Sequence, residues 1–581
     1  MKIPPFLAPL LLLVFAMQPA SAVEPAIFGV GFTNVTDSSA RLVFTTTEPM
    51  SSLVTVSCDG KTIATEGQPT REEIHAVELK GLQKGKEYTA VISAQGKDGK
   101  TVVSPDHKFT AALHAPSQHT WPGYTIFGTT INGADGFNPE LIARTGIRMV
   151  RMEVSWYDLQ TNGPTINQKY LDEVIRQVEE LKARGIEPLV VLDYCTPWAK
   201  PMTATTMTWR HPAFGPPDRL EDWETYLRTI VKALRGYTRY YEIWNEPDAG
   251  YLATGNYVER PNLPPPIGRP PFKDNWSYWL GDRFVPMIAS VRKVMNELQP
   301  DAIVMNGGWN RDYTGQRGDL MFARGVAPDL DVYAFHTYAA NPLSYARWHD
   351  AIDGGFRTNI DRIFKKHGVK MPLAVTEWGY PAWTKANPEK GFVTYDDARR
   401  FFVKSAFYFL GMERFEVLIQ FSFGIGPNTR ESDPLFFMLV NKEADGKIVL
   451  QPTYGTFQWL ATTFGSKVYR ALPVRVSPAD HVTAYAIQLK DSGDTYLVVW
   501  QDGKLEDKGT MAAQPARLAE ITIDELKGGK YAVQPLDLDG KPKGQGSEVS
   551  GASSFKLSIT LPEISSTAES DFYLAKISAG K

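Results

Sequence analysis

The sequence predicts an α/β protein in which a (β/α)8 TIM barrel lies between two β-rich domains. Residues 120–462 alternate short apolar strands with amphipathic helices, the pattern of βα units around a parallel sheet. Residues 24–113 and 463–581 instead alternate apolar and polar side chains with period two between turn signals. A length of 581 residues is also too great for one hydrophobic core, so several domains are expected.

Residues 1–22 are predicted to be a secretory signal peptide. Lys2 gives a positive start, residues 6–17 are apolar, and Ala20-Ser21-Ala22 is a small-residue cleavage site. The alternative, a membrane anchor, is disfavoured because this apolar run is too short to span a bilayer. No later segment reaches about 18 uninterrupted apolar residues, so we expect no transmembrane segment after signal removal. The expected location is therefore the periplasm, the cell surface or the medium.

Residues 24–113 are predicted to form a β-sandwich. Period-two alternation occurs over residues 40–44, 53–56 and 88–92. Leu82, followed six positions later by Tyr88, resembles the tyrosine corner of fibronectin type III domains. Phe44 stands where those domains usually carry a tryptophan. The resemblance implies a fibronectin type III-like module, which is more often a spacer or docking unit than a catalytic one.

Eight strands are predicted in the barrel region. They span residues 124–128, 149–153, 188–193, 240–245, 303–306, 332–336, 373–377 and 417–421. Apolar residues recur at helical spacing over residues 171–181 and 220–234, between these strands. A proline-rich insertion at residues 261–271 follows the fourth strand. It either walls a substrate cleft or is a surface excursion, and the sequence leaves both possibilities open.

The C-terminal region, residues 463–581, is predicted to be a second β-sandwich. Residues 482–487 alternate in polarity, and residues 496–500 form a β-rich run followed by the turn signal Asp502-Gly503. This domain would pack on the barrel or bind sugar.

Charge and composition exclude several classes of function. The net charge is −3 and no basic run resembles a nucleic-acid footprint, so no nucleic-acid partner is expected. The two cysteines, Cys58 and Cys195, lie in different predicted domains and provide neither a disulfide framework nor a thiolate metal site. The histidines show no metal-binding spacing and no glycine-rich phosphate loop follows a strand, so we expect no metal and no cofactor. The oligomeric state is not indicated.

Two short motifs carry the predicted chemistry. Trp244-Asn245-Glu246-Pro247 ends the fourth predicted strand, and Thr376-Glu377-Trp378-Gly379 ends the seventh. Catalytic groups of such barrels lie at the carboxyl ends of the strands. Glycoside hydrolysis needs two carboxyl groups, one to protonate the departing oxygen and one to attack or assist at the sugar carbon. The sequence therefore predicts a glycosidase with a carbohydrate substrate, in which Glu246 and Glu377 are catalytic.

Asn245-Glu246-Pro247 and Glu377 resemble the glycoside hydrolase clan A superfamily over the barrel region. By that resemblance, Glu246 is the general acid/base, Glu377 is the nucleophile and Asn245 binds the sugar 2-hydroxyl. Glu246 must then hold a proton, so its pKa is expected to be raised.

Further residues take substrate-binding roles from the same resemblance. Arg151 resembles the arginine of the clan that supports the nucleophile, and His336 and Tyr338 match the position that orients the nucleophile or the acid. Residues 241–248 look closest to family 39, which includes β-xylosidases and α-L-iduronidases. Residues 376–380 resemble the cellulase and mannanase type of family 5.

The resemblance implies a retaining, two-glutamate double displacement. It leaves the sugar, the linkage and the choice between chain ends and internal bonds open. Two rival functions also remain: a transglycosylase on the same fold, and a carbohydrate-binding protein that has lost activity.

Several of these residues also have a purely structural interpretation. Trp198, Trp309 and Trp378 follow strands and would either stack on sugar rings or pack in the core. Arg151 could be a core salt-bridge residue and His336 a hydrogen-bonded core histidine. Asp193, Asn132 and Asn306 lie at or just beyond strand ends and are equally ambiguous, and they would bind sugar hydroxyls if they faced the substrate.

Overall fold

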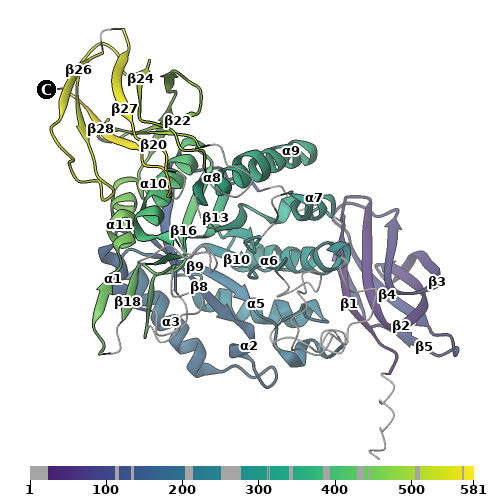
Figure 1. Cartoon of the computed structure of the whole chain (residues 1–581). Coiled ribbons are helices and arrows are strands. Elements are labelled where there is room, and N and C mark those ends of the chain that lie inside the picture. Colours follow the sequence, from purple (N-terminus) through teal and green to yellow (C-terminus); the bar gives the residue numbers. More distant parts are fainter. Residues whose placement is uncertain are drawn as a thin grey trace, which may run out of the picture.

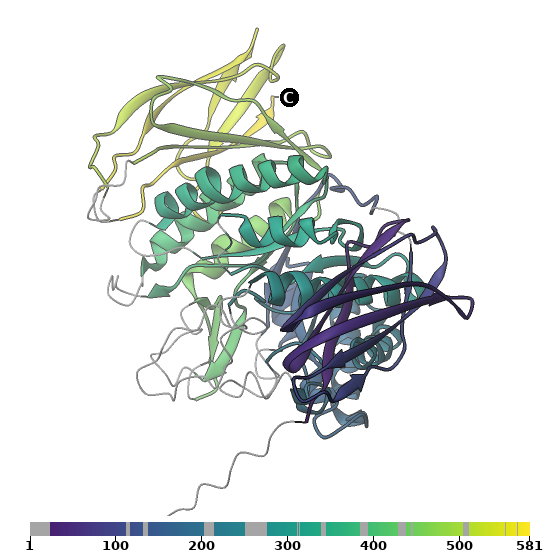
Figure 2. The same ribbon diagram turned by 90° about the vertical axis from the view of Figure 1, so that its right-hand side faces the viewer.

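A computed structural model of the chain describes residues 24–111, 117–131, 137–202, 214–249, 276–310, 312, 314–338, 344–383, 393–427, 437–442, 445–503, 511–551, 553–565 and 568–580. The predicted signal peptide, the proline-rich insertion and Asn132 lie outside these residues. A barrel stands between two β-rich regions, which are separate from each other in both views (Figures 1 and 2). None of the described helices is both long enough and apolar enough to cross a membrane.

The N-terminal β-domain is built around one long strand. It comprises β1 (Ile27–Thr33), β2 (Ser39–Cys58), β3 (Lys61–Lys80), β4 (Glu87–Gln95), β5 (Thr101–Val103) and β6 (His107–Thr110). Strand β2 pairs with β1 and β3 in its first half and with β3 and β4 in its second half. Burial alternates along β4, as the period-two sequence predicted. The Tyr88 hydroxyl accepts a hydrogen bond from the Gln83 amide at 2.7 Å, as in a tyrosine corner.

Eight parallel strands form the barrel, in the order β11-β10-β9-β8-β7-β16-β13-β12. Their bounds are β7 (Ile126–Thr130), β8 (Met149–Ser155), β9 (Glu187–Asp193), β10 (Tyr240–Ile243), β11 (Ile303–Asn306), β12 (Tyr333–Tyr338), β13 (Leu373–Gly379) and β16 (Phe415–Gln420). The predicted barrel is thus confirmed. The first strand begins two residues later than predicted, because Gly123 turns the chain with φ +86° and Thr125 forms only an isolated bridge to Gly465.

The barrel is nearly closed between β11 and β12. These two strands are joined through isolated bridges, Met305 to Val332 and Trp309 to Phe335, rather than through a continuous ladder. The buried Asn306 side chain completes this seam: it accepts from the Ala334 amide at 2.9 Å and donates to the Ala334 carbonyl at 2.8 Å. Asn306 therefore pairs strands, and the interpretation of it as a ligand for sugar hydroxyls is wrong.

Helices cover the outside of the barrel because their apolar faces need the outer faces of the strands. They are α1 (Pro139–Arg144), α2 (Trp156–Leu159), α3 (Gln168–Lys182), η2 (Pro197–Ala199), α5 (Leu220–Leu234), η4 (Ser277–Phe284), α6 (Val285–Leu298), α7 (Gln316–Ala323), η5 (Ala327–Asp329), α8 (Ser344–His349), η6 (Asp350–Arg357), α9 (Thr358–His367), α10 (Tyr395–Gly411) and α11 (Pro452–Phe464). The buried stripe of α3 consists of Leu171, Val174, Val178 and Leu181, as its spacing predicted. Short strands extend the loops: β14 (Ala382–Trp383), β15 (Val393–Thr394), β17 (Gly424–Pro427), β18 (Val440–Lys442) and β19 (Ile448–Leu450).

The C-terminal β-domain contains a six-stranded sheet, β20-β22-β23-β28-β25-β26, and a three-stranded sheet, β21-β24-β27. Its strands are β20 (Tyr469–Leu472), β21 (Arg475–Ser477), β22 (Val482–Leu489), β23 (Thr495–Gln501), β24 (Arg517–Ile523), β25 (Lys530–Pro535), β26 (Ser547–Ser550), β27 (Phe555–Leu561) and β28 (Tyr573–Ala579). Side chains of both sheets share one apolar core, among them Leu497, Ile521 and Phe555.

Polar contacts fix both β-domains to the barrel. On the N-terminal side, Arg41 forms an ion pair of 2.6 Å with Asp282 of η4. On the C-terminal side, Lys404 of α10 is completely buried and donates to Glu569 at 2.9 Å and to the Ser570 hydroxyl at 2.7 Å. The C-terminal strands accordingly lie over α10 in Figure 1.

We expect the variant Lys404→Met to lower the free energy of unfolding by about 3–5 kcal/mol, because Glu569 would stay buried without its cation. Thermal and urea unfolding would measure the loss. Lys366→Met is the matched control: it breaks an exposed pair with Asp319 and should cost at most about 1 kcal/mol. Equal stability of the two variants would contradict the importance of this buried contact.

Candidate active site

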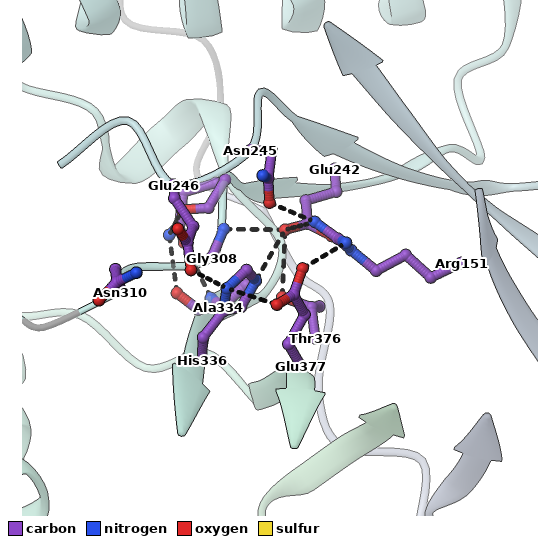
Figure 3. A network of polar contacts seen from close by, with 12 residues as sticks. Arg151, Glu242, Asn245, Glu246, Gly308, Asn310, Ala334, His336, Thr376 and Glu377 are labelled. Atoms are coloured by element: carbon purple, nitrogen blue, oxygen red, sulfur yellow. Dashed lines mark hydrogen bonds and ion pairs between the residues drawn. The ribbon is translucent and has the colours of Figure 1, made fainter. Parts of the chain in front are cut away.

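The carboxyl ends of the barrel strands, here called the barrel mouth, bring together six of the predicted site residues and one further glutamate, Glu242. The predicted residues come from β8, β12 and β13 or from the residues just after β10: Arg151, Asn245, Glu246, His336, Tyr338 and Glu377. Figure 3 shows most of them joined in one network of polar contacts. Parallel strands end at the same edge, so residues far apart in sequence meet there.

A turn after β10 presents Asn245 and Glu246 to the barrel mouth. Trp244 and Glu246 have φ values of +69° and +41°, in the left-handed region that non-glycine residues seldom adopt. The Trp244 ring is fully buried and points outward, against Tyr194 and Trp223. Anchoring of Trp244 on the outer side therefore leaves the next two side chains facing inward. Strained backbone of this kind is common at functional sites.

Arg151 ties the two strands with the predicted carboxylates to β8. Its guanidinium donates to Glu242 at 2.7 and 3.3 Å and to Glu377 Oε1 at 2.8 Å. It also donates to Asn245 Oδ1 at 2.9 Å, while the Asn245 amide donates to the Tyr194 hydroxyl at 3.0 Å. Arg151 is 1% exposed, so these contacts form away from water.

Glu242 is a third carboxylate that the sequence analysis missed. It is fully buried and also accepts from the Gly308 amide at 2.8 Å and the Thr376 hydroxyl at 3.1 Å. Burial alone would raise the pKa of Glu242, but Arg151 outweighs it and lowers that pKa to about 2. Within the apolar run Tyr240-Tyr241-Glu242-Ile243, the only signal was a charged residue at the inward-facing position.

His336 lies between the two predicted catalytic glutamates. Its Nδ1 is 2.9 Å from Glu246 Oε1 and 3.4 Å from Glu377 Oε2. Burial opposes a charge on the imidazole, but Glu377, Glu242 and Glu246 outweigh burial and raise the pKa of His336 to about 10. The histidine therefore carries a proton at neutral pH and contributes a second cation to the network.

The protonation of Glu246 differs from the expectation for a general acid. Burial acts to raise its pKa, but the hydrogen bond and charge of His336, with a hydrogen bond from Asn310, lower it. The backbone amide of Asn310 donates in turn to Asp248 Oδ1 at 2.9 Å and holds Asn310 in place. The proton of this pair therefore rests on His336 rather than on Glu246.

Tyr338 completes the surroundings of Glu377. Its hydroxyl donates to Glu377 Oε2, the oxygen that is not bound to Arg151. Burial, followed by the charge of Glu377, raises the pKa of Tyr338 well above its usual value, so the phenol keeps its proton. Both oxygens of Glu377 are therefore held by donors.

The three tryptophans that were predicted to bind sugar differ in their exposure to solvent. Trp198 is half-buried and donates to the Gln160 carbonyl at 2.8 Å, so part of it remains accessible. Trp378 and Trp309 are 0% and 1% exposed, and the prediction that they stack on sugar is wrong. The Trp378 ring packs against Phe402. Successive strand residues point to opposite faces, so inward-facing Glu377 sends its neighbour outward.

One triad in the barrel mouth has metal-ligand spacing. Ligand atoms of Glu246, His336 and Glu377 lie within 4.8 Å of one another, in the part of the chain that the structure describes. Two carboxylates and an imidazole are a donor set that suits zinc. However, the proton on His336 and the guanidinium of Arg151 already supply positive charge to these carboxylates.

Residues 115–401 match the family model for cellulases of glycosyl hydrolase family 5. This chain is a glycosidase. The matched region contains both glutamate motifs, and the glycosidase fits clan A, as the motifs indicated, with features of families 39 and 5. No curated protein matches the chain.

Several solved structures are similar to the glycosidase at low identity. A family 39 glycoside hydrolase from the gut symbiont Bacteroides cellulosilyticus WH2 is 13% identical, with a TM-score of 0.49, over 95% of this chain and 100% of that one. A family 1 β-glucosidase from Thermotoga maritima is 14% identical, with a TM-score of 0.41, over 59% and 98%. The exo-β-1,4-mannosidase Op5Man5 from Opitutaceae bacterium strain TAV5 is 14% identical, with a TM-score of 0.41, over 59% and 60%. Likenesses this distant carry no argument about substrate.

Gly308 provides a test of the position of His336 in the glycosidase. A Cβ atom on Gly308 would lie 2.1 Å from His336 Nε2 and 2.6 Å from Thr376 Oγ1. We expect Gly308→Ala to displace the imidazole and to lower kcat/KM by about 100-fold, the effect of a shift of about 1 Å in an active site. Gly354→Ala, with no atom within 4 Å of the new Cβ, is the control for kinetics and folding. Wild-type kinetics for Gly308→Ala would show that the site does not need His336 in this place.

Proposed function

We propose that the glycosidase is a retaining enzyme that cleaves O-glycosidic bonds of a poly- or oligosaccharide by double displacement. In this proposal Glu377 attacks the anomeric carbon and Glu246 protonates the leaving oxygen. Glu246 then deprotonates the water that releases the product. Asn245, the residue before Glu246, holds the 2-hydroxyl of the sugar.

The separation of the two carboxyl groups is the observation that carries this proposal. Ligand oxygens of Glu246 and Glu377 lie within 4.8 Å of each other and contact the same imidazole nitrogen. Retaining glycosidases place their carboxyl groups about 5–5.5 Å apart, whereas inverting enzymes need about 6.5–9.5 Å to admit a water. The spacing here is nearer to that of retaining enzymes and supports direct attack by a carboxylate.

The charges around Glu377 support its role as the nucleophile. Arg151 and Tyr338 donate hydrogen bonds to its two oxygens, one donor to each oxygen. The same two donors hold the attacking oxygen in a fixed orientation, so little reorganisation is needed when the bond to the sugar forms.

The proton for the leaving group is held by His336, which is hydrogen-bonded to Glu246. As negative charge develops on the leaving oxygen, the imidazolium of His336, 2.9 Å from Glu246 Oε1, passes its proton to Glu246, and Glu246 gives a proton to the leaving oxygen. After attack by water, the water proton returns along the same bond. The low pKa of Glu246 in the free site is thus compatible with an acid role, because Glu246 and His336 titrate as a pair.

The location and the outer domains belong to the same proposal. Residues 2–22 support export, since they combine a positive start, an apolar run and a small-residue cleavage site. The Tyr88–Gln83 hydrogen bond supports a fibronectin type III-like N-terminal module. Such a module would space or dock the catalytic barrel outside the cytoplasm.

Product stereochemistry tests the proposal. Wild-type protein would be offered a panel of aryl glycosides and polysaccharides, and the anomer released first would be identified by proton NMR before mutarotation. We expect the anomer of the substrate. Release of the opposite anomer would contradict double displacement. Transfer products with an added acceptor sugar would identify the transglycosylase alternative.

A further inference from the structure

A glutamate outside the predicted set lines the barrel mouth beside the nucleophile. Glu153 lies on β8 two residues beyond Arg151, so both side chains are on the inward face of the strand. Arg151 is buried and reaches Glu377, whereas Glu153, nearer the open end, is exposed to solvent. Burial of its surroundings and the charges of Glu377 and Glu242 raise the pKa of Glu153, although Arg151 opposes them. An exposed carboxylate on the inward face of β8 is accessible to a substrate that reaches the barrel mouth.

Asp193 lies at the end of β9, on the inward face that also carries Glu153. Glu153 pairs in register with Val191, so Asp193 is one pleat further along the same inward face. Asp193 is 0% exposed, and neither of its carboxyl oxygens has a hydrogen-bond partner among the residues that the structure describes. Burial, with Glu153 close by, raises the pKa of Asp193 well above its usual value, so it holds its proton. A buried acid without partners, directed at the barrel mouth, is a feature that packing alone does not explain.

This side of the barrel mouth offers no spare positive charge among the described residues of the network. The guanidinium of Arg151 is held by Glu242, Glu377 and Asn245. The protonated imidazole of His336 is held between Glu246 and Glu377. A substrate carboxylate placed here would meet Glu153 and would be repelled, while hydroxyl groups would find an acceptor.

We propose that Glu153 determines substrate class: it accepts hydrogen bonds from hydroxyl groups of the sugar next to Glu377 and excludes sugars that carry a carboxylate. The inference rests on the proposed function, because it places the cleaved sugar at Glu377. It assigns neutral glycosides as substrates and uronides as poor ones.

Matched aryl glycosides would test this assignment. Each pair consists of a neutral glycoside and the uronide of the same configuration. An example is 4-nitrophenyl β-glucoside with 4-nitrophenyl β-glucuronide, which differ only at C6. We expect the wild type to prefer the neutral member by at least about tenfold in kcat/KM. Glu153→Gln should lower kcat/KM for the neutral member by about 10-fold or more, mainly through KM, as loss of a hydrogen bond to a charged group does. The kcat/KM of Glu153→Gln for the uronide should not fall, so the ratio of kcat/KM for the neutral member to kcat/KM for the uronide should fall toward one.

Glu179→Gln, an exposed glutamate of α3 on the outer layer, is the matched control and should leave both rates unchanged. A wild type that prefers the uronide, or a Glu153→Gln variant with the wild-type ratio, would overturn the inference. Glu377→Ala separates the two proposals. If Glu377→Ala keeps its activity or no pair is cleaved, the proposed function fails and this inference falls with it; if Glu377→Ala is inactive but the ratios do not move, only Glu153 is wrongly assigned.

Discussion

Glu377→Ala should lower kcat/KM by about 10⁴-fold or more, because the bond-forming group of the first step is lost. The fold should survive, since Arg151 keeps Glu242 as its ion-pair partner. Azide should restore turnover by attacking the anomeric carbon directly from the face that Glu377 occupied. The glycosyl azide formed should therefore have the opposite anomeric configuration to the substrate, which NMR of the product would establish.

Glu246→Ala should behave differently with the same reagent. Its loss removes acid assistance, typically worth about 10²–10⁴-fold, and the loss should be smallest for substrates with good leaving groups. The glycosyl-enzyme bond to Glu377 still forms with activated substrates, so azide should release a glycosyl azide of retained configuration. Glu179→Ala controls for surface effects. If both variants gave the same azide anomer, or either kept wild-type activity, the two roles would be wrongly assigned.

The barrel was predictable because its strands are buried on both faces. Such strands are largely apolar runs, and the polar residues Glu246 and Glu377 at or just after two of them marked the carboxyl ends of those strands in the sequence. What could not be predicted is pairing that depends on register. Glu242 and Arg151 lie 91 positions apart and meet only because β8 and β10 both flank β9 in the sheet.

The rest of the site could not be predicted because the sequence does not show which side chains near a strand end face the interior of the barrel. Trp378 follows Glu377 directly, and a position near a strand end does not reveal which of two neighbours faces inward. The β12–β13 pairing shifts register between Phe335 and His336, which brings His336 opposite Glu377. A shift of that kind leaves no trace in the sequence, so His336 could be proposed as a site residue but not as the contact between both glutamates.

The sequence also could not predict whether Glu246 or His336 carries the proton that they share. The acid role that the resemblance implies for Glu246 predicted a raised pKa, but a neighbouring imidazolium lowers the pKa of Glu246. The distribution of one proton between two groups depends on a distance of 2.9 Å, which only the fold sets. In the proposed mechanism the general acid is accordingly better described as the Glu246–His336 pair.

Arg151→Met should be the most damaging change away from the two glutamates. It would leave Glu242 buried without its cation and Glu377 without one of its donors. We expect the free energy of unfolding to fall by about 3–5 kcal/mol, which thermal and urea unfolding would measure. The exposed pair between Arg414 and Asp361 provides the control, since Arg414→Met should cost at most about 1 kcal/mol.

A double variant separates the structural role of Arg151 from its catalytic one. Adding Glu242→Met to Arg151→Met removes both buried charges, so most of the lost stability should return. Activity should stay at least about 100-fold below wild type, because Glu377 still lacks the cation that orients and stabilises its carboxylate. Recovery of kcat/KM together with stability would mean that Arg151 serves the fold alone. Persistent instability would mean that Glu242 packs for reasons other than its ion pair.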